Sequence, residues 1–331
     1  MRRSRHRSGE GYHRGRFHAA WLLVSAVLVL ATAGCGSTVG AAPASSAPQS
    51  STNGWQVLWI SPSVQLAGLS VFDSQHIWVA GSDGLLYAWD GTGWHVQRVG
   101  DDLSRMVALD QRDAWVSNDD GIQHWDGTHW ELTSPDRAVT ALAAADARHV
   151  WAADPAGIRA WSGTGWTSQY AAAGALFQGI AAVDSSHAWA VGSLASGSGV
   201  VVALDGSSWS IQATLPQPLS AVYASDPAHA WAVSPDGSIF AWDGTVWRLT
   251  ANLHMDLTDV SGTDAAHVWA VAASGEVLFY NGTRWAVQYR APTTLGGVAA
   301  IDAGHVWAIG FDTVYSTVAQ GSASDWNSSG L

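Results

Sequence analysis

The chain has 331 residues, of which 21 are Trp and 35 are Gly, and only 13% are charged. A hydrophobic fraction of 47% excludes an intrinsically disordered chain. All 15 basic residues are Arg, and six of them lie within residues 1–16, so the rest of the chain holds 9 Arg against 26 acidic residues, a balance of −17. This charge argues against a nucleic-acid binder, which needs a basic surface, and against a protein that binds anionic lipid surfaces.

Residues 1–34 have the pattern of an export signal. A basic stretch is followed by an apolar run over 19–34, which ends in small residues directly before Cys35, the only cysteine. The Thr-Ala-Gly-Cys that ends there resembles the lipobox of bacterial lipoproteins, although Thr32 stands where that family more often has Leu. The resemblance implies lipidation of Cys35 and anchoring at the outer face of the bacterial cytoplasmic membrane. Two alternatives stay open: an uncleaved anchor, although the apolar run is shorter than the roughly 20 residues that span a bilayer, and a plain secretory signal.

Two uncharged or polar segments flank the region that is expected to fold. Residues 35–54 are rich in Gly, Ala, Ser, Thr and Pro and contain no charged residue, which predicts a flexible tether. Residues 319–331 are predicted to form a flexible C-terminal tail. Because the single cysteine cannot form an intrachain disulfide, the domain between these segments must rely on its core.

A repeated unit fills residues 55–318. Each unit reads as an apolar strand, D-x-x-H-V-W-A-V, a turn with Gly, a further apolar strand, W-D-G-T-x-W and a last strand. The first Trp anchor of the units recurs every 36 to 42 residues, at Trp78, Trp115, Trp151, Trp189, Trp231, Trp269 and Trp307. Four short strands per unit at this period predict a β-propeller, and strands bounded by Gly, Asp, Asn and Pro oppose helical repeats.

The two ends of the repeat region predict how the propeller closes. The C-terminal unit has strands at 297–301, 305–310 and 313–318 but lacks the D-G-T-x-W turn. The first strand of the region, at 55–60, has no unit of its own and supplies the missing fourth strand. The expected fold is therefore all-β, a seven-bladed β-propeller with strand exchange between the N-terminal and C-terminal strands, which removes free sheet edges.

The repeated residues are interpreted as structural. The Trp anchors are expected to fill the wedges between blades, where each ring buries about 150–250 Å² and contributes on the order of 4–6 kcal/mol before opposing terms. The Asp of D-G-T-x-W and the Asp–His pair of D-x-x-H are expected to close turns. The Asp–His pairs recur once per blade around a ring and so cannot converge on one metal. No cofactor is predicted, apart from a weak signal for Ca²⁺ at acidic loop tips.

The repeat resembles two families of propellers. Segments such as 229–247 (HAWAVSPDGSIFAWDGTVW) are similar to the tectonin-type repeat, and the D-G-T-x-W turn is similar to a degenerate Asp-box of sialidase-like propellers. The Trp-Asp pair also resembles the WD repeat, but the Gly-His of that family is absent. Tectonin-type propellers include lectins and Asp-box propellers include glycosidases, so the resemblance implies a carbohydrate as one ligand class.

Catalysis is not predicted. The nine Arg beyond the leader occupy inconsistent positions in the blades, and the only Glu residues there are Glu131 and Glu276. No phosphate loop, nucleophile elbow, zinc-protease motif or EF-hand is present.

Departures from the repeat are the candidate ligand-binding residues. They lie in the connections between the last strand of one blade and the first strand of the next, or at the start of that first strand, and are Arg105, Arg137, Phe177, His254, Asp256 and Asp259. The leading hypothesis is a monomeric, membrane-tethered, non-catalytic module outside the cytoplasm that presents one face to a glycan or an envelope protein. The alternatives are a carbohydrate-active hydrolase or lyase, and a scaffold for envelope assembly.

Overall fold

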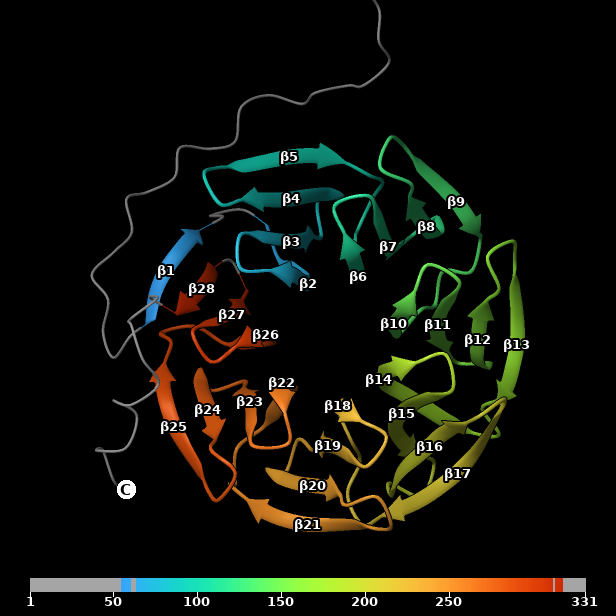
Figure 1. The fold of residues 1–331 in the computed structure, drawn as a ribbon, viewed down its shortest axis with the longest axis vertical. Helices are drawn as coiled ribbons and strands as arrows, with labels where there is room; N and C mark the ends of the chain where they lie inside the picture. The colour runs from blue at the N-terminus through green and yellow to red at the C-terminus, as the bar shows by residue number, and fades with distance from the viewer. Residues whose placement is uncertain (1–54, 61–63, 312, 318–331) are drawn as a thin grey trace, which may run out of the picture. The chain divides into compact units, whose positions relative to one another are not determined.

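The computed structural model describes residues 55–60, 64–311 and 313–317. They form 28 strands in seven four-stranded antiparallel sheets, which are arranged as blades in a ring (Figure 1). The predicted seven-bladed β-propeller is thus confirmed. In these ranges no helix is long and apolar enough to cross a membrane. Cys35 and the predicted signal, tether and tail lie outside the described residues.

Each blade is named from the inside outward by its strands A to D. Blade 1 comprises β2 (Leu66–Asp73), β3 (His76–Gly81), β4 (Leu85–Asp90) and β5 (Trp94–Arg98). Blade 2 comprises β6 (Arg105–Asp110), β7 (Asp113–Asn118), β8 (Gly121–Trp125) and β9 (Trp130–Ser134). Blade 3 comprises β10 (Ala141–Asp146), β11 (His149–Asp154), β12 (Gly157–Trp161) and β13 (Trp166–Ala171). Blade 4 comprises β14 (Ala175–Asp184), β15 (His187–Leu194), β16 (Gly199–Asp205) and β17 (Ser208–Leu215).

The remaining blades repeat the same order. Blade 5 comprises β18 (Ala221–Asp226), β19 (His229–Val233), β20 (Ser238–Trp242) and β21 (Trp247–Asn252). Blade 6 comprises β22 (Leu257–Asp264), β23 (His267–Ala272), β24 (Glu276–Tyr280) and β25 (Trp285–Arg290). Blade 7 comprises β26 (Leu295–Asp302), β27 (His305–Gly310), β28 (Thr313–Thr317) and β1 (Trp55–Ile60), so its outermost strand comes from the other end of the domain. The pairs Trp55↔Thr317 and Ile60↔Thr313 close the ring as predicted.

The wedges between blades form the core. The Trp of every strand B is at most 7% exposed and lies in an apolar cluster shared with the following blade. Two glutamines join neighbouring blades through these rings. Gln169 Oε1 accepts the indole N–H of Trp151 at 3.2 Å and of Trp209 at 2.9 Å, and Gln212 Oε1 accepts those of Trp189 at 3.0 Å and Trp247 at 2.7 Å. These four buried indole N–H groups thereby keep a partner.

The repeated Asp residues close turns. In the first A–B turn, Asp73 Oδ1 accepts the backbone N–H groups of Gln75 and His76, and the carboxylate contacts His76 Nδ1 at 2.7 Å. In the first C–D turn, Asp90 Oδ1 accepts the N–H of Thr92 at 2.9 Å, and Gly91 adopts a φ of +86° that favours glycine. We call the side with the A–B and C–D turns the turn face, and the side with the B–C and D–A connections the connection face.

Candidate functional site

The mouth of the central channel at the connection face is a cavity of about 580 Å³. The beginnings of the strands A line it, and in every blade one lining residue pairs with the residue two positions after the Trp of strand B. These equivalent residues, the channel ring, are Gly68, Arg105, Ala141, Gly179, Ala221, Asp259 and Gly297. Five members of the ring have no side chain larger than a methyl group. The other two have opposite charges.

Arg105 is the basic member of the ring and comes from blade 2. Its Nε donates to the Thr140 carbonyl at 2.6 Å, and an Nη donates to the Ser104 carbonyl at 3.2 Å. These two bonds anchor the guanidinium, which has five N–H donors, and leave further donors for a ligand. Burial lowers the pKa of Arg105, and the Asp259 charge opposes that shift. The group nevertheless stays charged, as arginine does in proteins.

Asp259 is the acidic member of the ring and comes from blade 6. Burial raises the pKa of its carboxyl to about 6, although the backbone N–H groups of Val298 and Val260 and the Arg105 charge favour the ionised form. The bond from Val298 measures 2.9 Å. A Cβ on the neighbouring Gly297 would lie 3.1 Å from Ile309 Cγ1 and 3.7 Å from Asp259 Oδ2, so a larger residue here would crowd Ile309 beside the carboxylate. Arg105 and Asp259 form no direct ion pair, so both charges remain available in the cavity.

Of the other four predicted ligand-binding residues, one lines the same cavity and three lie outside it. Asp256 lines the same cavity. Arg137 and His254 are exposed outside it, and His254 adopts a left-handed φ of +53° in the connection between β21 and β22. Phe177 is 1% exposed, because β14 already begins at Ala175 and turns this ring inward against Tyr170, 6.1 Å away. Phe177 therefore belongs to the wedge between blades 3 and 4, which places it away from any ligand at the connection face.

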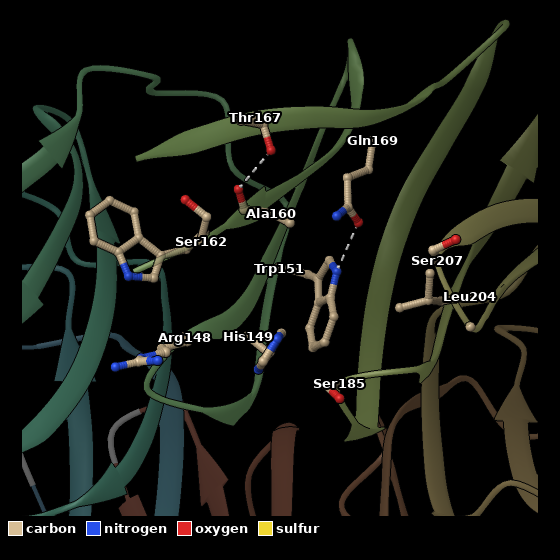
Figure 2. A pocket seen from close by; sticks show the side chains of 12 residues that line it. Arg148, His149, Trp151, Ala160, Ser162, Thr167, Gln169, Ser185, Leu204 and Ser207 are labelled. Carbon is tan, nitrogen blue, oxygen red and sulfur yellow. Dashed lines mark hydrogen bonds between the residues drawn. The ribbon is translucent and has the colours of Figure 1, made fainter. Parts of the chain in front are cut away.

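A second cavity, of about 450 Å³, opens at the turn face between blades 3 and 4 (Figure 2). Figure 2 shows Trp151 and Gln169 of blade 3 on one side of it, and Leu204 and Ser207 of blade 4 on the other. None of the ligand-binding residues predicted from the sequence lines this cavity.

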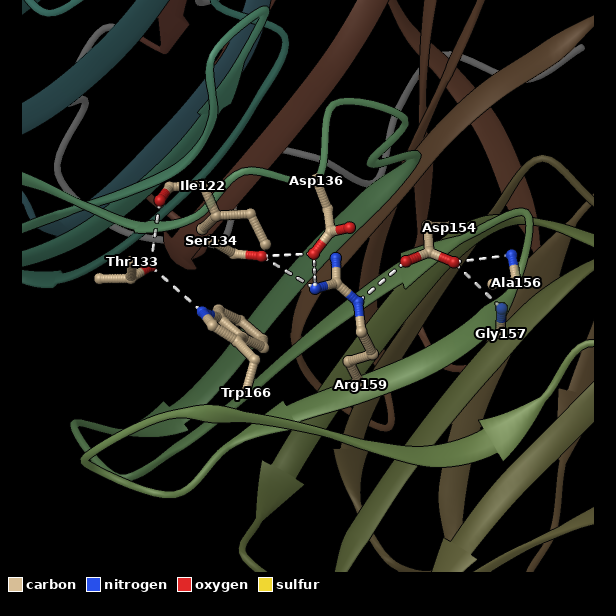
Figure 3. Close-up of polar contacts among 9 residues, drawn as sticks. All are labelled: Ile122, Thr133, Ser134, Asp136, Asp154, Ala156, Gly157, Arg159 and Trp166. Carbon is tan, nitrogen blue, oxygen red and sulfur yellow. Dashed lines mark hydrogen bonds and ion pairs between the residues drawn. The ribbon is translucent and has the colours of Figure 1, made fainter.

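A charged cluster on blades 2 and 3 contains two carboxylates (Figure 3). Arg159 Nε donates to Asp154 at 2.9 Å, and an Arg159 Nη donates to Asp136 and to Ser134. Asp154 also accepts the backbone N–H groups of Ala156 and Gly157 at 2.7 and 3.1 Å. Three donors occupy the Asp154 carboxylate, so the cluster holds the turn after Asp154 against β12. It does not present an acid–base pair. Among the described residues, no three His, Cys, Asp or Glu side chains are placed to hold a metal ion.

Comparison with known proteins gives structural neighbours only. No known family and no curated protein matches the sequence. The solved structure of YCF48 bound to D1 peptide matches with a TM-score of 0.63 at 16% identity, covering 83% of this chain and 100% of that one. The RRP9 WD40 repeats match with a TM-score of 0.66 at 13% identity, covering 82% and 99%. Streptogramin B lyase matches with a TM-score of 0.62 at 11% identity, covering 78% and 95%. These likenesses show that the chain is a β-propeller repeat protein.

Proposed function

We propose that the protein is a non-catalytic binding module that takes a charged segment of a protein partner into the mouth of its central channel. The observation behind this proposal is the channel ring, in which Arg105 and Asp259 are the only members with more than a methyl group. Blades 2 and 6 lie nearly opposite each other in a ring of seven, so the two charges face a common space.

The chemistry of the two groups defines the segment. The remaining N–H donors of Arg105 suit a carboxylate, which a guanidinium binds through charge-assisted hydrogen bonds. Asp259 suits an ammonium or guanidinium group. The small members of the ring leave room for backbone between these two contacts. A peptide with one carboxylate and one cationic group meets both requirements, whereas a neutral glycan offers no opposite charge to either group. The structural neighbour YCF48 bound to D1 peptide supports a peptide as the class of partner.

The location of the module is a separate part of the proposal. We infer from the Thr-Ala-Gly-Cys sequence that Cys35 is lipidated and that residues 36–54 tether the propeller outside the cytoplasmic membrane. Replacing Cys35 by Ala is then expected to release the protein into the medium or to leave an unprocessed precursor. Retention in the membrane at the mature size would contradict the lipid anchor.

A peptide array tests the binding proposal. The wild-type protein is expected to bind peptides that have both charges, and Arg105→Gln and Asp259→Asn are each expected to weaken that binding by about 10-fold or more, since a hydrogen bond to a charged group contributes about 1.5–3 kcal/mol. Arg137→Gln is the matched control, because Arg137 is exposed outside the cavity. Peptide binding that survives both ring variants would contradict the proposal. So would specific binding on a parallel glycan array with no peptide binding, or turnover of a bound glycan.

A further inference from the structure

The second cavity lies where blade 4 departs from the repeat. In six blades the last or next-to-last residue of strand C pairs with the Trp of strand D, as in Trp125↔Trp130 and Trp242↔Trp247. This residue is aromatic in five blades and is Leu204 in blade 4, where it pairs with Trp209. The aromatic residues are Trp89, Trp125, Trp161, Trp242 and Tyr280. Blade 4 alone among the six therefore lacks a ring at this position.

The missing ring and the cavity occupy the same wedge. Each of these strand-C residues packs in the apolar cluster shared with the preceding blade: Trp125 with blade 1, and Leu204 with blade 3. Leu204 accordingly lines the cavity together with Trp151 and Ala160. A leucine fills less of the wedge than an indole, and the space that remains opens toward the turn face.

A hydrogen-bond acceptor is left over in the same place. Trp125 Nε1 donates to the Gln111 carbonyl at 3.0 Å, and Trp242 Nε1 donates to the Pro227 carbonyl at 3.2 Å. Each of these carbonyls belongs to the residue after the Asp of its A–B turn. The equivalent residue in blade 4 is Ser185, which lines the cavity (Figure 2). Leu204 has no donor, and no group of the described residues donates to the Ser185 carbonyl.

We propose that this cavity binds an indole ring, supplied by a tryptophan side chain of a partner or by a free indole compound. The bound ring packs against Leu204 and Trp151, and its N–H donates to the Ser185 carbonyl. In blades 2 and 5 the indoles of Trp125 and Trp242 make the same bond to the equivalent carbonyls. The rim residues Gln169 and Ser207 face the remainder of the ligand. Because this site lies at the turn face, it is independent of the peptide proposed at the channel mouth.

Replacing Leu204 by Trp tests the site, because this change introduces the residue that four other blades have. The wild-type protein is expected to bind indole with a Kd of about 1 mM, the order expected for a fragment of this size, by saturation-transfer NMR or calorimetry. Leu204→Trp is expected to retain the fold and to lose this binding. Leu249→Trp is the matched control, since it adds an indole at a position that is 58% exposed on the outer strand of blade 5, and it is expected to bind like the wild type.

Two ligand comparisons complete the experiment. N-methylindole, which lacks the donor, is expected to bind at least about 5-fold more weakly than indole, since a hydrogen bond contributes about 1 kcal/mol. Binding of both indole and N-acetyltryptophanamide supports a partner's tryptophan, whereas binding of indole alone supports a free indole compound. Contacts from bound indole to the Leu204 methyl groups, observed as NOEs in the wild type, check the site even if Leu204→Trp fails to fold. Unchanged binding by a folded Leu204→Trp, or no saturable binding of any indole by the wild type, overturns the proposal.

Discussion

Asp259 is expected to destabilise the folded protein at neutral pH, and Asp259→Asn is expected to remove that effect. Its pKa is raised from 3.8 to about 6, chiefly because burial disfavours the charge. The unfolded chain releases this proton near the ordinary pKa and the folded chain only near pH 6. Between these values the folded state holds more protons, so the free energy of unfolding falls as pH rises. At about 1.4 kcal/mol per pKa unit, the free energy of unfolding falls by about 3 kcal/mol once the pH is well above 6.

Urea denaturation followed by Trp fluorescence measures this effect directly. The Asn side chain keeps an oxygen that can accept the Val298 N–H, which lies 2.9 Å from Asp259 Oδ2. The gain in stability of Asp259→Asn over the wild type should therefore grow from near zero at about pH 4 to about 3 kcal/mol at about pH 8. Asp256 is an exposed carboxylate of the same cavity, so Asp256→Asn is the control. Its free energy of unfolding should stay within about 0.5 kcal/mol of the wild-type value. A gain that does not vary with pH, or a loss of stability at pH 8, would refute the reasoning.

Three further predictions concern the framework. Gln212→Leu should cost about 2–4 kcal/mol in a denaturation experiment, because it leaves the buried indole N–H groups of two blades without an acceptor; a cost below about 0.5 kcal/mol would contradict this role. Trp231→Ala should cost about 3–5 kcal/mol by the same assay, since the ring is 5% exposed in the wedge between blades 5 and 6; unchanged stability with lost ligand binding would mark it as a ligand residue instead. The Ser186 N–H and the His187 imidazole lower the pKa of Asp184, so Asp184→Asn should be less stable than the wild type above about pH 4, and the difference should vanish in stronger acid.

The sequence predicted the framework well because the same physical requirement recurs in every blade. A Trp at a fixed place in strand B, a Gly in the next turn and an Asp that closes a turn are visible without knowledge of the neighbours. The glutamines that join the rings were not identified, although Gln169 and Gln212 both lie three residues after a strand-D Trp. Their role depends on which indole the next blade brings near, and that information is not local.

The candidate site was predicted only in part. Arg105 and Asp259 were recognised as departures from the repeat, but the ring to which they belong requires the pairing register of each strand A with its strand B. Phe177 shows the difficulty, because the sequence around it suggests a loop, whereas β14 begins at Ala175 and alternation then turns its side chain inward. A shift of one residue in register decides whether a side chain meets the ligand or the core.

The two proposed sites arise from opposite departures from one repeat. A residue type repeated seven times in the channel ring would place seven like charges, or none, around one space, and like charges in a poorly solvated channel repel. Opposite charges can therefore enter the ring only where single blades depart from the pattern, as blades 2 and 6 do with Arg105 and Asp259. Asp259 stands where five counterparts are Gly or Ala, and its ionised form opposes folding, so packing does not explain its presence.

In blade 4 the departure is a loss. Leu204 replaces an aromatic ring that would fill the wedge and donate a hydrogen bond to the carbonyl of the A–B turn. In both places we expect a stability lower than the repeat allows, as at sites where a structure leaves contacts for a ligand to complete.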